Sequence, residues 1–171
     1  MTDLLVRVWG GLLLMTVFAA VSAQTRRVDV PSTAPDGRFT DHGDGTISDA
    51  ATGLMSKQCA EGLSGVGCAV GSAEAKGWQL ALQVATDSGF AGRADWRLAN
   101  VNELESLLER RCFSPAINAT YFPNTPASAF WSSSAYVQGS FDAWYVEFGY
   151  GDVRNGSKIS ANYVRLVRVD Q

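Results

Sequence analysis

Histidine is almost missing from this chain of 171 residues, because His42 is the only one. A Ser-His-Asp site would have to use this residue, but we expect it in a turn and no nucleophile elbow accompanies it. Three cysteines without metal-ligand spacing also make a poor zinc site. We therefore expect a protein that is not an enzyme and that holds no metal and no cofactor.

Positive charge is also scarce, since 14 Lys and Arg stand against 17 Asp and Glu and the net charge is −3. A mildly acidic chain is a poor general binder of nucleic acid, so we exclude that class of partner. The sequence has no internal repeat and no Gly-X-Y pattern, which excludes a collagen-like stalk within it.

Long apolar runs are limited to one, over residues 8–21, which ends in the small residues Val21-Ser22-Ala23. This layout is typical of a secretory signal peptide, so we predict residues 1–23 as a signal peptide that contacts the membrane only during export. The alternative is an uncleaved anchor, but the run is short for crossing a bilayer. We expect a secreted or periplasmic protein with a flexible N-terminal arm over residues 24–37 and one domain over residues 38–171.

The stretch DHGDGTISDAATGLM, residues 41–55, places Asp41, Asp44 and Asp49 among glycines. A calcium loop of the EF-hand type would need an oxygen ligand at its third position and Glu at its twelfth, where this chain has Gly43 and Thr52. Asp and Gly are also the residues that tight turns require. We therefore predict two turns that join short strands, and no calcium site.

Two helices are predicted in the middle of the chain. The first covers residues 72–88, with Ser72 as its cap and Gly89 after its end. The second follows Asn100, which forms a capping box with Glu103, and runs toward residues 110–111. Its expected buried stripe consists of Val101, Leu104, Leu107 and Leu108.

The remainder is predicted as strands and loops. Residues 130–136, 142–149 and 162–169 have strand character, with Trp144, Val146 and Phe148 expected on one face of the middle strand. An Asn155-Gly156 pair indicates a hairpin turn between the last two. Hairpins, then two helices, then an antiparallel meander make an α+β domain.

Three cysteines remain to be placed: Cys59, Cys68 and Cys112. We pair Cys59 with Cys68, because they lie close together across a Gly-rich segment and export permits disulfides. Cys112 is then either a free buried thiol or the true partner of one of the other two.

Seven segments of the chain resemble one bacterial family in their order: FTDHGDGTISDAATGLM, CAEGLSGVGC, GWQLAL, FAGRADWRLANVNELESLLERRCFSPAIN, YFPNTPASAFWSSSAY, AWYVEFGYG and YVRLVR. It is the Lcl C-terminal domain family, named after the Legionella collagen-like adhesin, and the resemblance covers about residues 38–169. The resemblance implies a C-type lectin-like fold in a single domain, with two helices packed on antiparallel hairpins and a C-terminal meander. DWRLANVNELESLL and YVRLVR also resemble parts of formylglycine-generating enzymes, but no catalytic residue carries over.

The resemblance says less about function. Most members are exported bacterial proteins without a known activity, and the collagen-like adhesin is trimeric and binds sulfated glycosaminoglycans. This chain lacks the collagen stalk and is acidic. Shared fold alone does not transfer a function.

We expect the late meander and its loops to form a binding face, because Tyr and Arg are adaptable contact residues and sugars stack on aromatic rings. At any single position, a solvated polar edge is an equally good interpretation. Arg165 and Arg168 point to opposite faces of a strand, so we expect at least one in a structural ion pair. The candidate ligand-binding residues are Tyr136, Tyr145, Tyr150, Arg154, Asn155, Lys158 and Asn162.

Two functions from different classes follow from the sequence. The first is an exported, non-enzymatic module that binds a partner on the cell surface, either a protein or a glycan, with acidic and sulfated glycans among the candidates. The alternative is a structural or accessory subunit of a bacterial cell-surface assembly, which could include self-association into a homo-oligomer.

Overall fold

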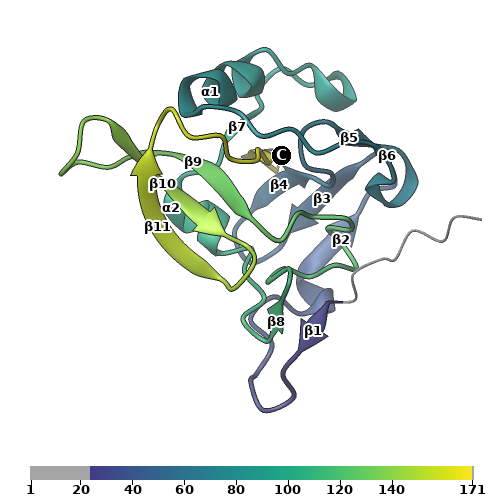
Figure 1. The fold of residues 1–171 in the computed structure, drawn as a ribbon. Coiled ribbons are helices and arrows are strands. Elements are labelled where there is room, and N and C mark those ends of the chain that lie inside the picture. The colour runs from purple at the N-terminus through teal and green to yellow at the C-terminus, as the bar shows by residue number, and fades with distance from the viewer. Residues whose placement is uncertain (1–23, 171) are drawn as a thin grey trace, which may run out of the picture.

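Five antiparallel strands form the larger sheet, and its first two hairpins come from the Asp- and Gly-rich stretch (Figure 1). The computed structural model describes residues 24–170, so the predicted signal peptide lies outside the described residues. The strands lie in the order β2-β3-β4-β12-β7 and comprise β2 (Phe39–Asp41), β3 (Thr46–Asp49), β4 (Leu54–Lys57), β7 (Arg97–Leu98) and β12 (Leu166–Val169).

Both predicted turns in this stretch are confirmed. Asp44 closes the turn between β2 and β3, because its carboxylate accepts hydrogen bonds from the Thr46 amide at 2.9 Å and the Thr46 hydroxyl at 2.6 Å. Asp49 closes the turn between β3 and β4 by accepting from the Ala51 amide at 3.0 Å. Such local bonds explain why the chain needs Asp at these positions.

The smaller sheet has three antiparallel strands in the order β11-β10-β9. They are β9 (Ala129–Ala135), β10 (Asp142–Glu147) and β11 (Asp152–Ser157). The predicted Asn155-Gly156 turn is wrong, because both residues lie inside β11, opposite Trp144 and Ala143 of β10. The chain turns over residues 148–151 instead. Glycine suits position 156 of the strand, because an added Cβ would lie 3.0 Å from the Tyr145 ring.

The helices are shorter than the sequence predicts. Helix α1 covers Trp78–Thr86, and the predicted start at Ser72 is wrong. Residues before it are held extended by tertiary hydrogen bonds, since the Glu74 amide donates to Glu61 and Lys76 pairs with Asn162. These backbone bonds override the local helix preference.

Helix α2 covers only Val101–Glu105, but its predicted capping box is confirmed. The Asn100 side chain accepts from the Glu103 amide at 2.9 Å, and the Glu103 carboxylate accepts from the Asn100 amide at 2.8 Å. Of the described helices, none is long and apolar enough to cross a membrane.

Two further strand pairs are short. Strand β5 (Leu63–Ser64) pairs with β6 (Val70–Gly71), and β1 (Thr25–Arg26) pairs with β8 (Cys112–Phe113). Single turns of 3-10 helix occur at Asp36–Arg38, Val66–Cys68 and Phe90–Gly92.

The N-terminal segment packs against the domain, which differs from the flexible arm that the sequence predicts. The Gln24 side chain donates to the carbonyls of Pro115 and Ile117, both at 2.6 Å. Farther along, the buried Ala34 donates its amide to Glu109 at 3.1 Å. Residues 24–37 are therefore part of the folded unit.

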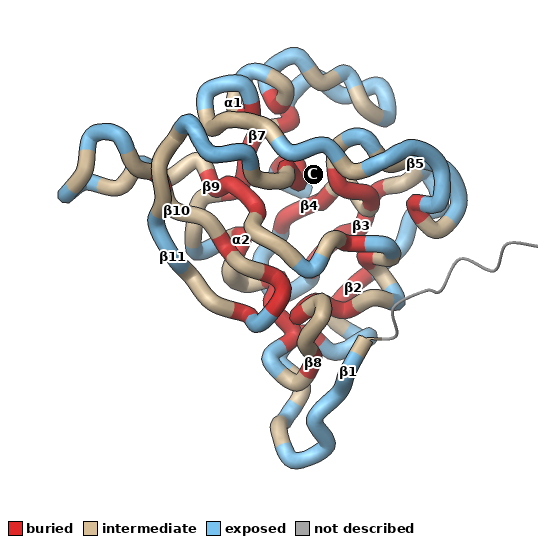
Figure 2. Tube along the Cα trace, viewed as in Figure 1, coloured by how far each residue is buried: buried red, intermediate tan, exposed pale blue. Residues whose placement is uncertain are grey.

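Two clusters of buried side chains fill the interior, where Figure 2 shows the buried parts of the chain. The first includes Leu104 of α2 together with Val146 and Phe148. The second lies under α1 and includes Ala143 and the fully buried Trp131. Since β10 contributes to both clusters, each face of the smaller sheet is partly covered.

Candidate binding groove

A groove of about 770 Å³ opens beside the turn between β2 and β3. Five parts of the chain line it, spread between residues 41 and 123, so only the fold brings them together. They contribute the turn residues Asp41, Gly43, Asp44 and Gly45, then Lys57, Gln58 and Cys59, then Leu63, Ser64, Gly65, Val66 and Gly67, and finally Phe90, Thr120 and Pro123.

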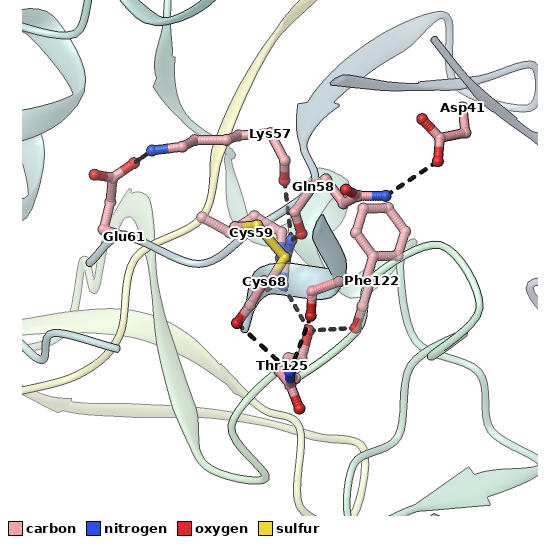
Figure 3. The surroundings of a disulfide bond; sticks show 11 residues. Asp41, Lys57, Gln58, Cys59, Glu61, Cys68, Phe122 and Thr125 are labelled. Carbon is pink, nitrogen blue, oxygen red and sulfur yellow. Dashed lines mark hydrogen bonds and ion pairs between the residues drawn. A yellow bond between two sulfur atoms is a disulfide. The ribbon is translucent and has the colours of Figure 1, made fainter. Parts of the chain in front are cut away.

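Two carboxylates on one side of the groove are held in fixed orientations. Asp41 accepts from the Gly43 amide at 2.8 Å and from the Gln58 side-chain amide at 3.2 Å (Figure 3). Asp44 is bound through the Thr46 hydroxyl and amide, and these bonds lower its pKa below the usual range. Both groups are therefore oriented hydrogen-bond acceptors.

The groove lining also includes an aromatic ring. Phe90 lies against Gly45, where an added Cβ would meet the ring at 2.9 Å, so this position requires glycine. The Lys57 ammonium stands 4.8 Å from the centre of the same ring and pairs with Glu61 at 2.8 Å (Figure 3). The positive charge of Lys57 is thus already compensated within the protein.

A disulfide forms the third wall. Cys59 and Cys68 are bonded, with Cα atoms 5.4 Å apart, and Cys112 is a buried free thiol. The predicted pairing is therefore confirmed. The loop between the bonded cysteines presents Val66, which is 98% exposed and lies on the groove rim.

Arg165 holds the floor of the groove in place. Its guanidinium is fully buried and donates to the carbonyls of Lys57 and Gln58 at 3.0 and 2.5 Å and to the Thr125 hydroxyl at 2.7 Å. It also stacks 4.8 Å from the Phe122 ring. Burial lowers the pKa of Arg165 to about 9, so the group is still charged at neutral pH.

Arg168 has the structural role that the sequence predicts for at least one of the two arginines. Its Nε lies 2.8 Å from the Asp95 carboxylate, which confirms the expected ion pair.

His42 forms a hydrogen bond across the first hairpin, with its Nε2 2.6 Å from the Ser48 hydroxyl. Ser48 is only 8% exposed and lies in β3, which pairs with a strand on each side. The contact therefore joins the start of the turn after β2 to β3. Among residues 24–170, no group of three or more His, Cys, Asp and Glu side chains is placed to hold a metal ion.

The residues of the predicted binding face are spread over different surfaces. Tyr145 and Arg154 are neighbours, since they face each other across β10 and β11. Tyr145 is half-buried against Trp131, with ring centres 6.0 Å apart. Asn155 is exposed, but it lies on the opposite face of the sheet from Arg154, because side chains alternate along a strand.

Three other predicted residues lie farther along the same sheet and its loops. Tyr136 packs against Trp144 at the start of the 136–141 loop, with ring centres 5.1 Å apart. Tyr150 is 78% exposed in the turn between β10 and β11. Asn162 is used in a backbone bridge to Lys76.

Lys158 is occupied within the protein. Its ammonium donates to the Ser140 carbonyl at 2.7 Å and lies 4.8 Å from the centre of the Trp78 ring. Because Arg154 bonds to Asp152 at 2.7 Å, neither cation of the predicted pair stands free. The structure does not gather these seven residues into one patch.

Sequence reasoning therefore missed the groove, although it had singled out the Asp-Gly turns and the Cys59–Cys68 loop. An available signal was the density of Gly in both segments, together with the Asp residues of the first one, which leaves backbone and carboxylates accessible. Long-range contacts, such as the hydrogen bond from Arg165 to the Lys57 carbonyl, determine that the Asp-Gly turns and the Cys59–Cys68 loop face each other.

One family model matches the chain. It is described as the Lcl C-terminal domain, and it matches residues 45–168, which include most of the groove lining but not Asp41, Gly43 or Asp44. No curated protein matches the chain.

Proposed function

The chain belongs to the Lcl C-terminal domain family, and we propose that it is a non-enzymatic module that binds a neutral glycan in the groove. The observation that carries this proposal is the pair of oriented carboxylates, Asp41 and Asp44, in a groove lining that also includes the Phe90 ring. Carboxylates accept hydrogen bonds from sugar hydroxyls, and an aromatic ring offers a surface for the apolar face of a sugar. The Gln58 amide beside them adds a further polar group.

The charges of the groove favour a neutral glycan over an acidic or sulfated one. Asp41 and Asp44 would repel a sulfate, and the only cation in the lining, Lys57, is paired with Glu61 at 2.8 Å. The overall charge of −3 acts in the same direction.

We further propose that the module is exported and has a C-type lectin-like arrangement. The apolar run over residues 8–21 and the Cys59–Cys68 disulfide support export, because disulfides persist in oxidising compartments. Two helices packed on antiparallel sheets are compatible with the lectin-like arrangement that the family resemblance implies.

The test is a titration of the exported protein with neutral, acidic and sulfated glycans at two salt concentrations. A neutral glycan should bind with an affinity that salt does not change, since no ion pair with the ligand is screened. Asp41→Ala should weaken this binding by about 10- to 100-fold, the effect of losing one hydrogen bond to a charged group. The matched control is Asp29→Ala, which removes an exposed carboxylate outside the groove lining.

Two results would contradict this function. One is the absence of binding to every neutral glycan tested. The other is equal affinity of Asp41→Ala and the parent, because the carboxylate would then contribute nothing to recognition.

A second candidate function is a structural or accessory subunit of a surface assembly. It is favoured by exposed apolar side chains on two adjoining loops, where Val137, Phe141 and Ile159 are 94%, 82% and 92% exposed. The loops meet where the Lys158 amide donates to the Phe141 carbonyl at 2.8 Å.

This candidate predicts that Phe141→Ser with Ile159→Ser releases the protein from the assembly, as measured by gradient fractionation of the exported material. The matched control is Val28→Ser, which changes an apolar side chain of 96% exposure elsewhere. Unchanged fractionation of the double variant would exclude these loops as the contact.

A further inference from the structure

Strand β11 is an edge of the smaller sheet, because the order β11-β10-β9 gives it a partner on one side only among the described strands (Figure 1). The Lys158 amide donates to the Phe141 carbonyl just beyond the strand ends, so these two residues form a hydrogen-bonded pair. The register of β10 and β11 then determines which residues of β11 form hydrogen bonds to β10. Even-numbered residues of β11 then bond to β10. The main chains of Val153, Asn155 and Ser157 face outward.

The edge carries opposite charges at alternate positions on one face. Asp152 and Arg154 are two residues apart and pair with each other at 2.7 Å within the chain, while their side chains remain 47% and 60% exposed and can exchange this partner for one in a second copy. Charge on an edge strand normally deters pairing with another strand. Here the pattern is self-complementary, because an antiparallel copy can set Asp152 of each strand against Arg154 of the other.

We propose that two copies of this chain pair antiparallel through β11, with Val153 at the twofold axis. In this register the outward amide and carbonyl of Val153 bond to those of Val153 in the second copy. Asp152 then lies opposite Arg154 of the second copy, in the closer type of cross-strand pair. The two smaller sheets become one continuous six-stranded sheet.

Other registers are less suitable. A twofold axis at Arg154 sets two arginines against each other, which is destabilising. An axis at Asn155 sets Asp152 against Lys158 but Arg154 against Gly156, so Arg154 has no charged residue opposite it. The charges thus select the register centred on Val153, and the partner they fit is a second copy.

The experiment is sedimentation velocity of the full exported protein over a wide concentration range. The parent should convert from monomer to dimer as its concentration rises. Arg154→Asp and Asp152→Arg should each raise the dimer Kd by about tenfold or more, because two attractive pairs become repulsive. The double variant, Asp152→Arg with Arg154→Asp, should restore the parent Kd.

The matched control is Arg27→Asp, since Arg27 and Asp29 form an exposed pair of the same spacing outside β11. It should leave the dimer Kd unchanged, and thermal melts should show that every variant is folded. A parent that stays monomeric overturns the proposal. The proposal is also overturned if the single changes leave the dimer Kd unchanged, or if the double change does not restore the parent Kd.

Discussion

Removing the disulfide should destabilise the protein by an amount that depends on the length of the loop that it closes. Cys59 and Cys68 are 9 residues apart, and a loop of this length is worth roughly 2.5 kcal/mol in the chain-entropy model. Alanine is the suitable replacement, because the two positions are 7% and 1% exposed and a serine hydroxyl would be buried there. We expect Cys59→Ala with Cys68→Ala to lower the free energy of unfolding by about this amount.

Urea titration measures the change directly, and a thermal melt should show a decrease in Tm of about 5–10 °C for a chain of this size. Reductant provides the control. It should lower the parent to the stability of the double variant and leave the double variant unchanged, since Cys112 has no disulfide partner.

The disulfide also forms a wall of the groove, so the effect should be local as well as global. Hydrogen exchange should become faster over residues 60–71, while β10 remains protected. Glycan affinity should fall along with this protection. If the double variant unfolds at the parent's urea concentration, the disulfide does not restrain the unfolded chain, and the reasoning is refuted.

Three further predictions concern core packing, pH and the free thiol. Leu104→Ala, at a fully buried position, should cost about 2–5 kcal/mol in urea titration, whereas Tyr150→Ala, at 78% exposure, should cost less than about 0.5 kcal/mol. Burial alone would raise the pKa of Asp49, but bonds from Arg38, Thr52 and Ala51 outweigh it and lower this pKa below the ordinary 3.8. Asp49 therefore stabilises the fold above about pH 4, and this stability is lost as pH falls through the lowered value. In acid titrations Asp49→Asn should lose less stability below that pH than the parent, and equal losses would contradict the assignment. Cys112, at 3% exposure, should react with an alkylating reagent only after unfolding, as read by mass spectrometry, and rapid labelling of the folded protein would contradict its burial.

Local signals in the sequence predicted those features whose bonds are local. The Asp44 and Asp49 turns and the Asn100–Glu103 box are correct, because each is closed by bonds within a few residues. The same reasoning failed at Ser72 and at Asn155. Near Ser72 the local preference is outweighed by distant partners such as Asn162, and at Asn155 it is outweighed by pairing with Trp144 of the neighbouring strand.

The groove was beyond local reasoning for the same physical reason. Its walls come from the first hairpin, the disulfide loop, Phe90 and residues 120–123. The sequence marks each segment as a turn or loop, but no spacing rule states that they face one another. Such facing is set by core contacts, which cannot be assigned before the sheet order is known.

Arg165 makes clear how the fold holds these segments together, and at what thermodynamic cost. Placing a guanidinium in the interior is unfavourable, and within the described residues no carboxylate forms an ion pair with it. Its two terminal nitrogens donate instead to the Lys57 and Gln58 carbonyls, which lead into the disulfide loop, and to Thr125, which follows the 120–123 wall, while its buried Nε has no partner among the described residues. An apolar side chain would fill the same volume without burying a charge, but it would leave those three acceptors free to move. A buried cation that fixes loops from separate parts of the chain suits the binding groove proposed above, because a preorganised site loses less conformational freedom on binding.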